Sequence, residues 1–227
     1  MPVNIQLNAF SSTQYLDQAL SGFVAEKLRQ GITERGAASL AVSGGRTPAG
    51  FFQALSQAGL DWSRVTITLV DERCVEEESP YSNTRSVRTH LLQANAAAAC
   101  FLPLYLPGDK SNDANKRLSC LPDRFDAVVL GMGEDGHTAS IFPNSPQREA
   151  ALHHPAAALL VEGEAPVRHR ITLSARRLLA TRQLILHITG ESKWQILGRA
   201  LNAPDPVLPI SHFLHIKGIE KHVFWTR

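Results

Sequence analysis

The sequence predicts an α/β protein with a doubly wound, mostly parallel sheet and helices on both faces. Apolar strand-like segments alternate with helical segments along the 227 residues, which is the order that a parallel sheet requires. The strand segments are continuously apolar, as strands covered on both faces are. Several end in polar or glycine-rich turns, and ligands of such sheets bind beyond the carboxyl ends of the strands. We expect one domain over residues 1–227, with its functional residues at those ends.

The first elements follow from periodicity and helix-start signals. Apolar side chains recur at three- and four-residue spacing over residues 13–30, which predicts an amphipathic helix. The short apolar run at residues 39–42 predicts a strand. Pro48 favours a helix over residues 48–56, because proline suits the first helical turn. The β-branched run at residues 65–70 predicts the next strand.

The later elements are predicted in the same way. Ser82 is a favourable N-cap for a helix that reaches about Leu92. Residues 109–121 show a weaker helical pattern, and the apolar run at residues 125–130 is typical of a buried strand. The remaining expected elements are strands near residues 157–161, 170–173, 184–188 and 223–225 and helices near residues 175–179 and 191–201.

Composition and charge argue against several classes of function. Apolar residues make up 44% of the chain and charged residues 19%, which is typical of a globular protein. The net charge of +2 is too small for a concentrated nucleic-acid-binding face. No secretory signal or apolar run of membrane-spanning length is apparent. Cys74, Cys100 and Cys120 lack C-x-x-C spacing, which indicates free thiols in a reducing compartment. We expect a cytoplasmic monomer or weak homo-oligomer, with neither nucleic acid nor membrane as a partner.

A candidate anion-binding turn follows the strand at residues 39–42. Its residues are Ser43, Gly44, Gly45, Arg46 and Thr47. Adjacent glycines let backbone amides approach an anion, and the N-terminus of the following helix favours negative charge. The hydroxyls and the guanidinium can add contacts to phosphate oxygens. The alternative is a tight turn in which a hydroxyl side chain only caps the helix. The spacing of a nucleotide-binding P-loop is absent.

A second glycine-rich segment, at residues 131–136, matches the dinucleotide-binding pattern G-x-G-x-x-G. That pattern requires a long helix directly after it, which Pro143 and Pro146 would interrupt, and it normally belongs to the first strand–helix unit. We therefore expect no dinucleotide cofactor. The glycines better suit a loop that presents Asp135 and His137.

His137 is the candidate general base. An imidazole has a pKa of about 6.5 and accepts protons at physiological pH. The carboxylate of Asp135 can fix its tautomer and stabilise the imidazolium. From the residues alone, a structural role for His137 is as open as a catalytic one. No His or Cys pattern has the spacing of a zinc site, so no metal is expected. Six further histidines are expected to be surface or packing residues: His153, His154, His187, His212, His215 and His222.

Three cations are expected at strand or helix ends that can meet at one rim of the sheet. These are Arg73, Arg170 and Lys193. Together they suit a phosphate dianion, because arginine gives bidentate contacts and lysine a point charge. Taken singly, each can instead be a solvated surface charge. Asp71 is expected as a further polar residue of the same site.

In combination these motifs are specific enough to indicate a protein family. The stretch G-x-G-x-D-G-H-T-A-S-x-F-P occupies residues 131–143, with support from residues 43–48, 71–73, 82–83, 170–173, 189–190 and 193. They resemble the 6-phosphogluconolactonase family over essentially the whole chain. The resemblance implies the Rossmann-like fold that this family shares with glucosamine-6-phosphate deaminases and ribose-5-phosphate isomerases. It also implies hydrolysis of 6-phospho-D-glucono-1,5-lactone in the oxidative pentose phosphate pathway, without a required metal or cofactor.

The same resemblance implies roles for individual residues. His137 is the counterpart of the family's catalytic histidine. The substrate site would contain Ser43, Gly44, Gly45, Arg73, Arg170 and Lys193. Two positions depart from the pattern, because Arg46 stands where many relatives have serine and Cys74 where they often have tryptophan.

Two alternatives to a lactonase remain. One is an aldose–ketose phosphosugar isomerase or deaminase. The related deaminases have a glutamate five residues after the histidine, where this chain has Phe142, and an apolar side chain cannot act as an acid or base. The other is a non-enzymatic sugar-phosphate sensor, which is disfavoured because the first strand is expected close to Met1 and leaves no room for a DNA-binding helix-turn-helix.

Overall fold

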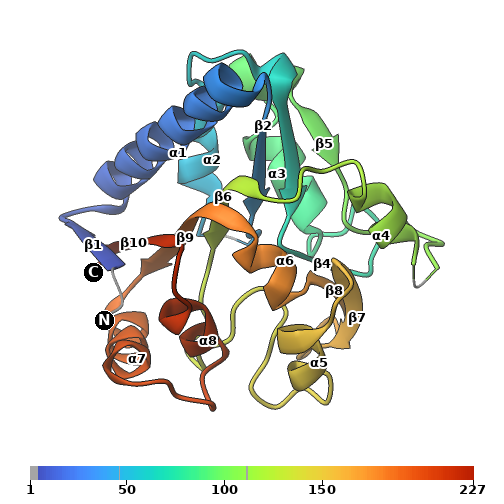
Figure 1. Ribbon diagram of the computed structural model, residues 1–227, viewed down its shortest axis with the longest axis vertical. Coiled ribbons are helices and arrows are strands. Elements are labelled where there is room, and N and C mark those ends of the chain that lie inside the picture. The colour runs from blue at the N-terminus through green and yellow to red at the C-terminus, as the bar shows by residue number, and fades with distance from the viewer. Residues whose placement is uncertain (1–4, 46, 111) are drawn as a thin grey trace.

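A seven-stranded parallel sheet lies at the centre of the computed structural model, which describes residues 5–45, 47–110 and 112–227 (Figure 1). All its neighbouring strands run parallel. The predicted α/β class is therefore confirmed. Across the sheet the strands are β1 (Ile5–Phe10), β10 (Glu220–Thr226), β9 (Thr181–Thr189), β6 (Phe125–Leu130), β2 (Ala38–Val42), β3 (Val65–Leu69) and β5 (Cys100–Leu102).

The direction in which strands are added reverses beside β2. From β2 the chain adds β3 and β5 on one side, and then returns to add β6, β9 and β10 on the other. In doubly wound sheets a crevice opens at such a switch point, and ligands bind there. The segments that follow β2 and β6 lie side by side at the carboxyl edge of the sheet, because the Ser43 N–H donates to the carbonyl of Val129 at 2.9 Å.

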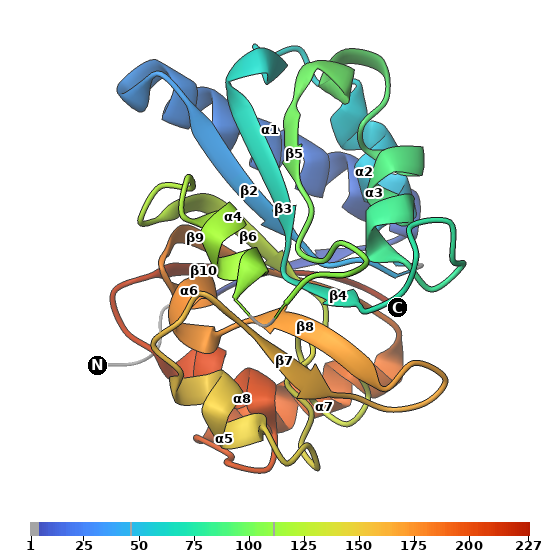
Figure 2. The same cartoon turned by 90° about the vertical axis from the view of Figure 1, so that its right-hand side faces the viewer.

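Helices cover both faces of the parallel sheet (Figures 1 and 2). On one face lie α1 (Thr13–Arg35), α2 (Ala49–Ser56) and α3 (Asn83–His90), and on the other α7 (Glu191–Asn202) and α8 (Pro209–His215). The shorter helices are α4 (Asp113–Leu118), α5 (Arg148–His153), α6 (Ala175–Leu179) and the 3₁₀ turns Trp62–Arg64 and Ala94–Ala98. Among the described residues, no helix combines the length and apolar character needed to cross a membrane.

The first helix begins where the sequence predicts and ends later. Ser12 is its N-cap and accepts a hydrogen bond from the Tyr15 N–H at 3.3 Å. The prediction stops at residue 30, whereas α1 continues to Arg35. Its buried face includes Gly31, so tertiary packing outweighs the weak helix propensity of glycine at that position.

Two predicted strands do not join the main sheet. β7 (Ala158–Glu162) and β8 (His169–Leu173) pair with β4 (Asp71–Arg73) in a separate antiparallel sheet. The two sheets meet at Val70, whose N–H donates to Val42 of β2 and whose carbonyl accepts from Leu173 of β8. As a result, the small sheet stands against the carboxyl edge of the main sheet (Figure 2).

The remaining differences concern short elements. The weak helix expected over residues 109–121 is reduced to the six residues of α4. The strands β4 and β5 and the helices α5 and α8 are absent from the prediction, and each has seven residues or fewer. Such segments contain too few periods for a hydrophobic pattern to identify them.

Candidate active site

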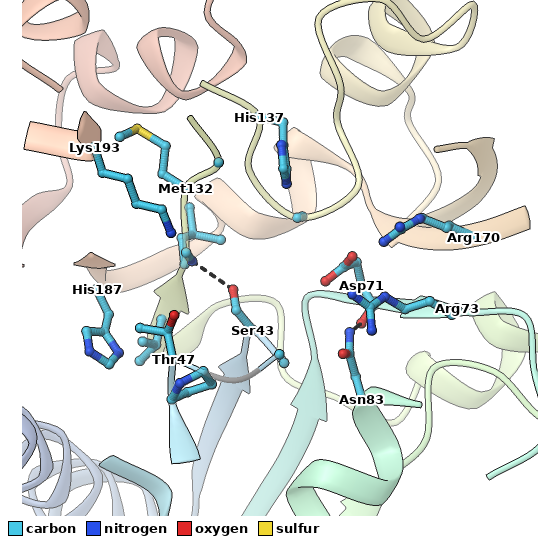
Figure 3. Close-up of a pocket in the computed structure, with 18 residues that line it drawn as sticks. Ser43, Thr47, Asp71, Arg73, Asn83, Met132, His137, Arg170, His187 and Lys193 are labelled. Carbon is cyan, nitrogen blue, oxygen red and sulfur yellow. Dashed lines mark hydrogen bonds between the residues drawn. The ribbon is translucent and has the colours of Figure 1, made fainter. Parts of the chain in front are cut away.

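A cavity of about 450 Å³ opens at the switch point, between the central strands and the small antiparallel sheet (Figure 3). Its size is within the range of small-molecule sites. The structure brings together at its wall nine of the predicted residues: Ser43, Gly44, Gly45, Thr47, Asp71, Arg73, His137, Arg170 and Lys193. Asp135 adjoins the cavity through its contact with His137. Arg46 lies outside the described residues.

The turn at residues 43–45 is held between β6 and α3. Ser43 Oγ accepts a hydrogen bond from the Gly131 N–H at 2.9 Å, which joins the turn to the loop after β6. A Cβ atom at Gly44 would overlap the side chain of Asn83, so only glycine lets the turn lie this close to α3. Among the described residues, no side chain caps the helix that follows. The structure therefore does not support the alternative interpretation, in which a hydroxyl side chain of the turn only caps this helix.

His137 and Asp135 form a hydrogen-bonded pair on the loop after β6. The distance from His137 Nδ1 to Asp135 Oδ1 is 2.6 Å, and the same oxygen accepts from the His137 N–H at 3.1 Å. A Cβ at Gly133 would overlap both side chains, so this glycine is required for the pair to form. The His137 ring also packs against Phe142, with ring centroids 4.4 Å apart. With Nδ1 engaged, Nε2 is the nitrogen left for proton transfer.

The pKa of Asp135 lies below its usual value. Burial alone would raise it, but the hydrogen bond and the charge that the His137 ring can carry outweigh burial. Asp135 is therefore ionised at neutral pH. An ionised carboxylate at Nδ1 favours the tautomer that keeps the proton there and leaves Nε2 as an acceptor.

Arg73 and Arg170 form a cationic pair across the small sheet. They are register partners on β4 and β8. Arg73 donates to the Tyr81 carbonyl at 2.6 Å, and Arg170 donates to the Val167 carbonyl at 3.1 Å. Within the described part of the chain neither forms an ion pair with a carboxylate. Burial and the charge of Arg73 lower the pKa of Arg170. A bound dianion would relieve this repulsion.

Lys193 lies across the turn at residues 43–45 from the arginine pair. It lies in the first turn of α7, and Figure 3 shows Ser43 and His137 between it and Arg170. Burial lowers its pKa, while nearby Glu134 acts in the other direction. Glu134 is itself held by Ser192, whose hydroxyl donates to it at 2.7 Å.

A buried polar framework supports the arginine side of the cavity. Asp71 is buried and accepts from the Ser140 hydroxyl at 2.5 Å. Asn83 donates to the Asp71 carbonyl at 2.9 Å. The Glu72 carboxylate accepts from the N–H groups of Arg73, Asn83 and Thr84. A role for Glu72 or Ser140 could not be predicted from the sequence, because their partners come from other segments of the chain.

His187 is a pocket residue that sequence reasoning missed. We expect it to be a surface or packing residue, yet it lines the cavity with 3% of its side chain exposed. Its Nε2 lies 3.9 Å from Asp17 Oδ1, and neither atom has a hydrogen-bond partner among the described residues. Burial, with a smaller effect of Lys193, lowers the pKa of His187 to about 4. Burial raises the pKa of Asp17 to about 6.

These opposite shifts predict opposite pH dependences in two variants. In Asp17→Asn the remaining His187 has a folded pKa below its unfolded value, so the unfolded chain binds more protons. The free energy of unfolding should then fall as pH decreases from about 6.5 to 4. In His187→Leu the remaining Asp17 has a folded pKa above its unfolded value. The free energy of unfolding should rise as pH decreases from about 6 to 4.

Urea unfolding across this pH range measures both slopes relative to the wild type, in which the two effects oppose each other. Each slope is at most about 1.4 kcal/mol per pH unit, the effect of one bound proton. Slopes of the same sign in the two variants would contradict the assigned directions.

Comparison with known proteins gives matches over nearly the whole chain. The family model described as glucosamine-6-phosphate isomerases/6-phosphogluconolactonase matches residues 11–225. A 6-phosphogluconolactonase of Rhizobium meliloti is 39% identical, over 99% of this chain and 100% of that protein. A 6-phosphogluconolactonase of Pseudomonas aeruginosa is 41% identical, over 94% of this chain and 93% of that protein.

Solved structures agree with the sequence matches. A 6-phosphogluconolactonase from Shewanella baltica superimposes with a TM-score of 0.96 at 40% identity, and the match covers 100% of both chains. A monomeric glucosamine-6-phosphate deaminase superimposes with a TM-score of 0.81 at 17% identity. The second match shows a shared fold alone.

Proposed function

The chain belongs to the glucosamine-6-phosphate isomerase/6-phosphogluconolactonase family, and we infer that it hydrolyses 6-phospho-D-glucono-1,5-lactone to 6-phospho-D-gluconate in the oxidative pentose phosphate pathway. One observation carries this proposal. A carboxylate-held imidazole and cations without carboxylate partners among the described residues face the same cavity. The lactone requires both, because it has a phosphate at one end and an ester carbon at the other. We further propose that the enzyme acts in the cytoplasm as a monomer or weak homo-oligomer.

In this proposal the phosphate binds over residues 43–45 and Thr47 of the turn that follows β2. Amides and hydroxyls of the turn contact its oxygens, while Lys193 approaches from one side and the pair Arg73 and Arg170 from the other. Charge-assisted hydrogen bonds of this kind are the strong ones in protein sites. Binding energy from the phosphate then holds the reacting end of the substrate in place.

His137 acts on the lactone end of the bound substrate. Its Nε2 removes a proton from a water molecule as the water oxygen bonds to C1. The carbonyl electron pair moves to oxygen and gives a tetrahedral intermediate, and nearby donors stabilise the oxyanion. Collapse of this intermediate breaks the bond between C1 and the ring oxygen, and the imidazolium returns its proton to that oxygen. Asp135 stabilises the imidazolium in between.

The structure gives a physical reason to prefer a lactonase over a deaminase. Phe142 packs against the His137 ring. The guanidinium carbon of Arg170 lies over the Phe142 ring, 5.3 Å from its centroid. Phe142 thus holds two site residues in position, but it cannot supply the acid–base group that ring opening of an amino sugar needs. Lactone hydrolysis needs only an activated water and oxyanion stabilisation.

A direct assay tests the proposed function. Freshly generated 6-phosphogluconolactone is added, and proton release or coupled oxidation of 6-phosphogluconate is followed against a no-enzyme control, because such lactones also hydrolyse unaided. We expect turnover well above the spontaneous rate and no ammonia release from glucosamine 6-phosphate. Lactone loss at the spontaneous rate, or ammonia release, would contradict the proposal.

A further inference from the structure

His187 stands at the end of the cavity where the phosphorylated end of the substrate is proposed to bind. Figure 3 shows it beside Thr47 and below Lys193, away from the two arginines. It comes from the carboxyl end of β9. Its partner Asp17 comes from α1, and the Asp17 carboxylate lies so close to Gly50 of α2 that a Cβ atom there would overlap it. The pair therefore touches the helix that follows the phosphate-binding turn.

The His187 ring packs edge-on against Phe51, with ring centroids 6.1 Å apart, but contacts among the described residues do not satisfy its polar atoms. A buried polar atom without a partner destabilises the folded state, and His187 Nε2 is such an atom in the described part of the chain. A ligand hydrogen bond at the other ring nitrogen would not satisfy Nε2 itself, but it would offset the cost of burying the ring at this position. His222 provides the contrast. It is also buried, on the neighbouring strand β10, but its Nε2 lies 3.0 Å from Gln183 Oε1. Its polar group is satisfied within the fold, whereas that of His187 is not.

The geometry decides which ring nitrogen can meet a ligand. Nε2 is fully buried and faces Asp17 Oδ1 at 3.9 Å, so Nδ1 is the nitrogen left for the cavity. The negative carboxylate favours the tautomer with its proton on Nε2. Nδ1 then has a free lone pair and accepts a hydrogen bond. A phosphate dianion has no proton to donate, whereas a sugar hydroxyl does.

We propose that His187 is a specificity-determining residue whose Nδ1 accepts a hydrogen bond from a hydroxyl group of the bound phosphosugar lactone, near the phosphate, while Asp17 orients the ring. The proposal rests on the proposed lactonase function. Because His187 is almost fully buried, this hydrogen bond forms away from water, where it is strong. The site therefore distinguishes a polyhydroxy acid from a simple phosphate.

The test uses His187→Leu, His187→Asn and the matched control His222→Leu in the whole enzyme. Leucine is close to histidine in size and has no acceptor, whereas the asparagine Oδ1 occupies nearly the position of Nδ1. The measurements are kcat and KM for the lactone, inhibition constants for 6-phosphogluconate and for inorganic phosphate, and the melting temperature.

We expect His187→Leu to raise KM and the inhibition constant of 6-phosphogluconate about three- to tenfold. The kcat should stay within about twofold, and the inhibition constant of phosphate should not change. The melting temperature should not fall, since an unsatisfied polar atom is removed. His187→Asn should recover most of the affinity. His222→Leu should lower the melting temperature and leave KM unchanged.

An unchanged KM in a folded His187→Leu variant would overturn the proposal. Equal weakening of 6-phosphogluconate and inorganic phosphate would also overturn it, because the ring would then act on the phosphate or on Lys193 and not on a hydroxyl. A wild-type enzyme without lactone turnover would refute the proposed function instead, so the two failures are distinct.

Discussion

Replacing His137 by alanine is expected to lower kcat for the lactone by about 10²–10⁴-fold, the usual contribution of a general base. The structure explains why the loss should fall on kcat. The ring is held by Asp135 through Nδ1 and packs against Phe142, while the proposed phosphate contacts come from other segments. The affinity for 6-phosphogluconate should therefore change by no more than a few fold.

Stopped-flow or proton-release kinetics, with calorimetric binding of 6-phosphogluconate, measure the two quantities separately. Asp135→Asn is the companion variant. It preserves the shape of the side chain but removes the charge that stabilises the imidazolium, so kcat should again fall while binding is retained. His153→Ala is the control, because this histidine is largely exposed and lies outside the cavity. Near-normal turnover in folded His137→Ala would exclude the proposed mechanism.

Replacing Arg170 by methionine should raise KM by about 10- to 100-fold, as expected for the loss of charge-assisted contacts to a phosphate. The flexible apolar side chain can still pack on Phe142, so kcat should change less than KM. The stability of the free protein should be maintained or improved, because Arg73 and Arg170 repel each other without a ligand. The double variant with Arg73→Met should bind 6-phosphogluconate more weakly still.

Arg177→Met is a closely matched control for this prediction. Arg177 also lies over a phenylalanine, with its guanidinium 3.9 Å from the Phe125 ring centroid, and also donates to backbone carbonyls. It lies outside the cavity. Its replacement should lower the melting temperature and leave KM unchanged. If Arg170→Met bound 6-phosphogluconate as tightly as the wild type, the phosphate contact assigned to the arginine pair would be wrong.

Much of the fold could be predicted because its elements carry local patterns. The helix α1 and the strand β6 are recognisable from the spacing of apolar residues within their own segments. The same holds for part of the candidate site. Asp135 and His137 lie two residues apart on a glycine-rich loop, and their hydrogen bond is a local contact. Family resemblance of these short motifs added the substrate class.

The sequence by itself therefore determined the α/β class, most of the elements and the motif residues that line the cavity. Only the tertiary structure decided that β7 and β8 leave the main sheet, which sets Arg170 beside Arg73. It alone placed His187 opposite Asp17, in the lining of the pocket. The physical reason is the range of the contacts. Pairing of strands and burial of a polar side chain depend on partners from distant segments, and a local pattern contains no information about which partner the folded chain will supply.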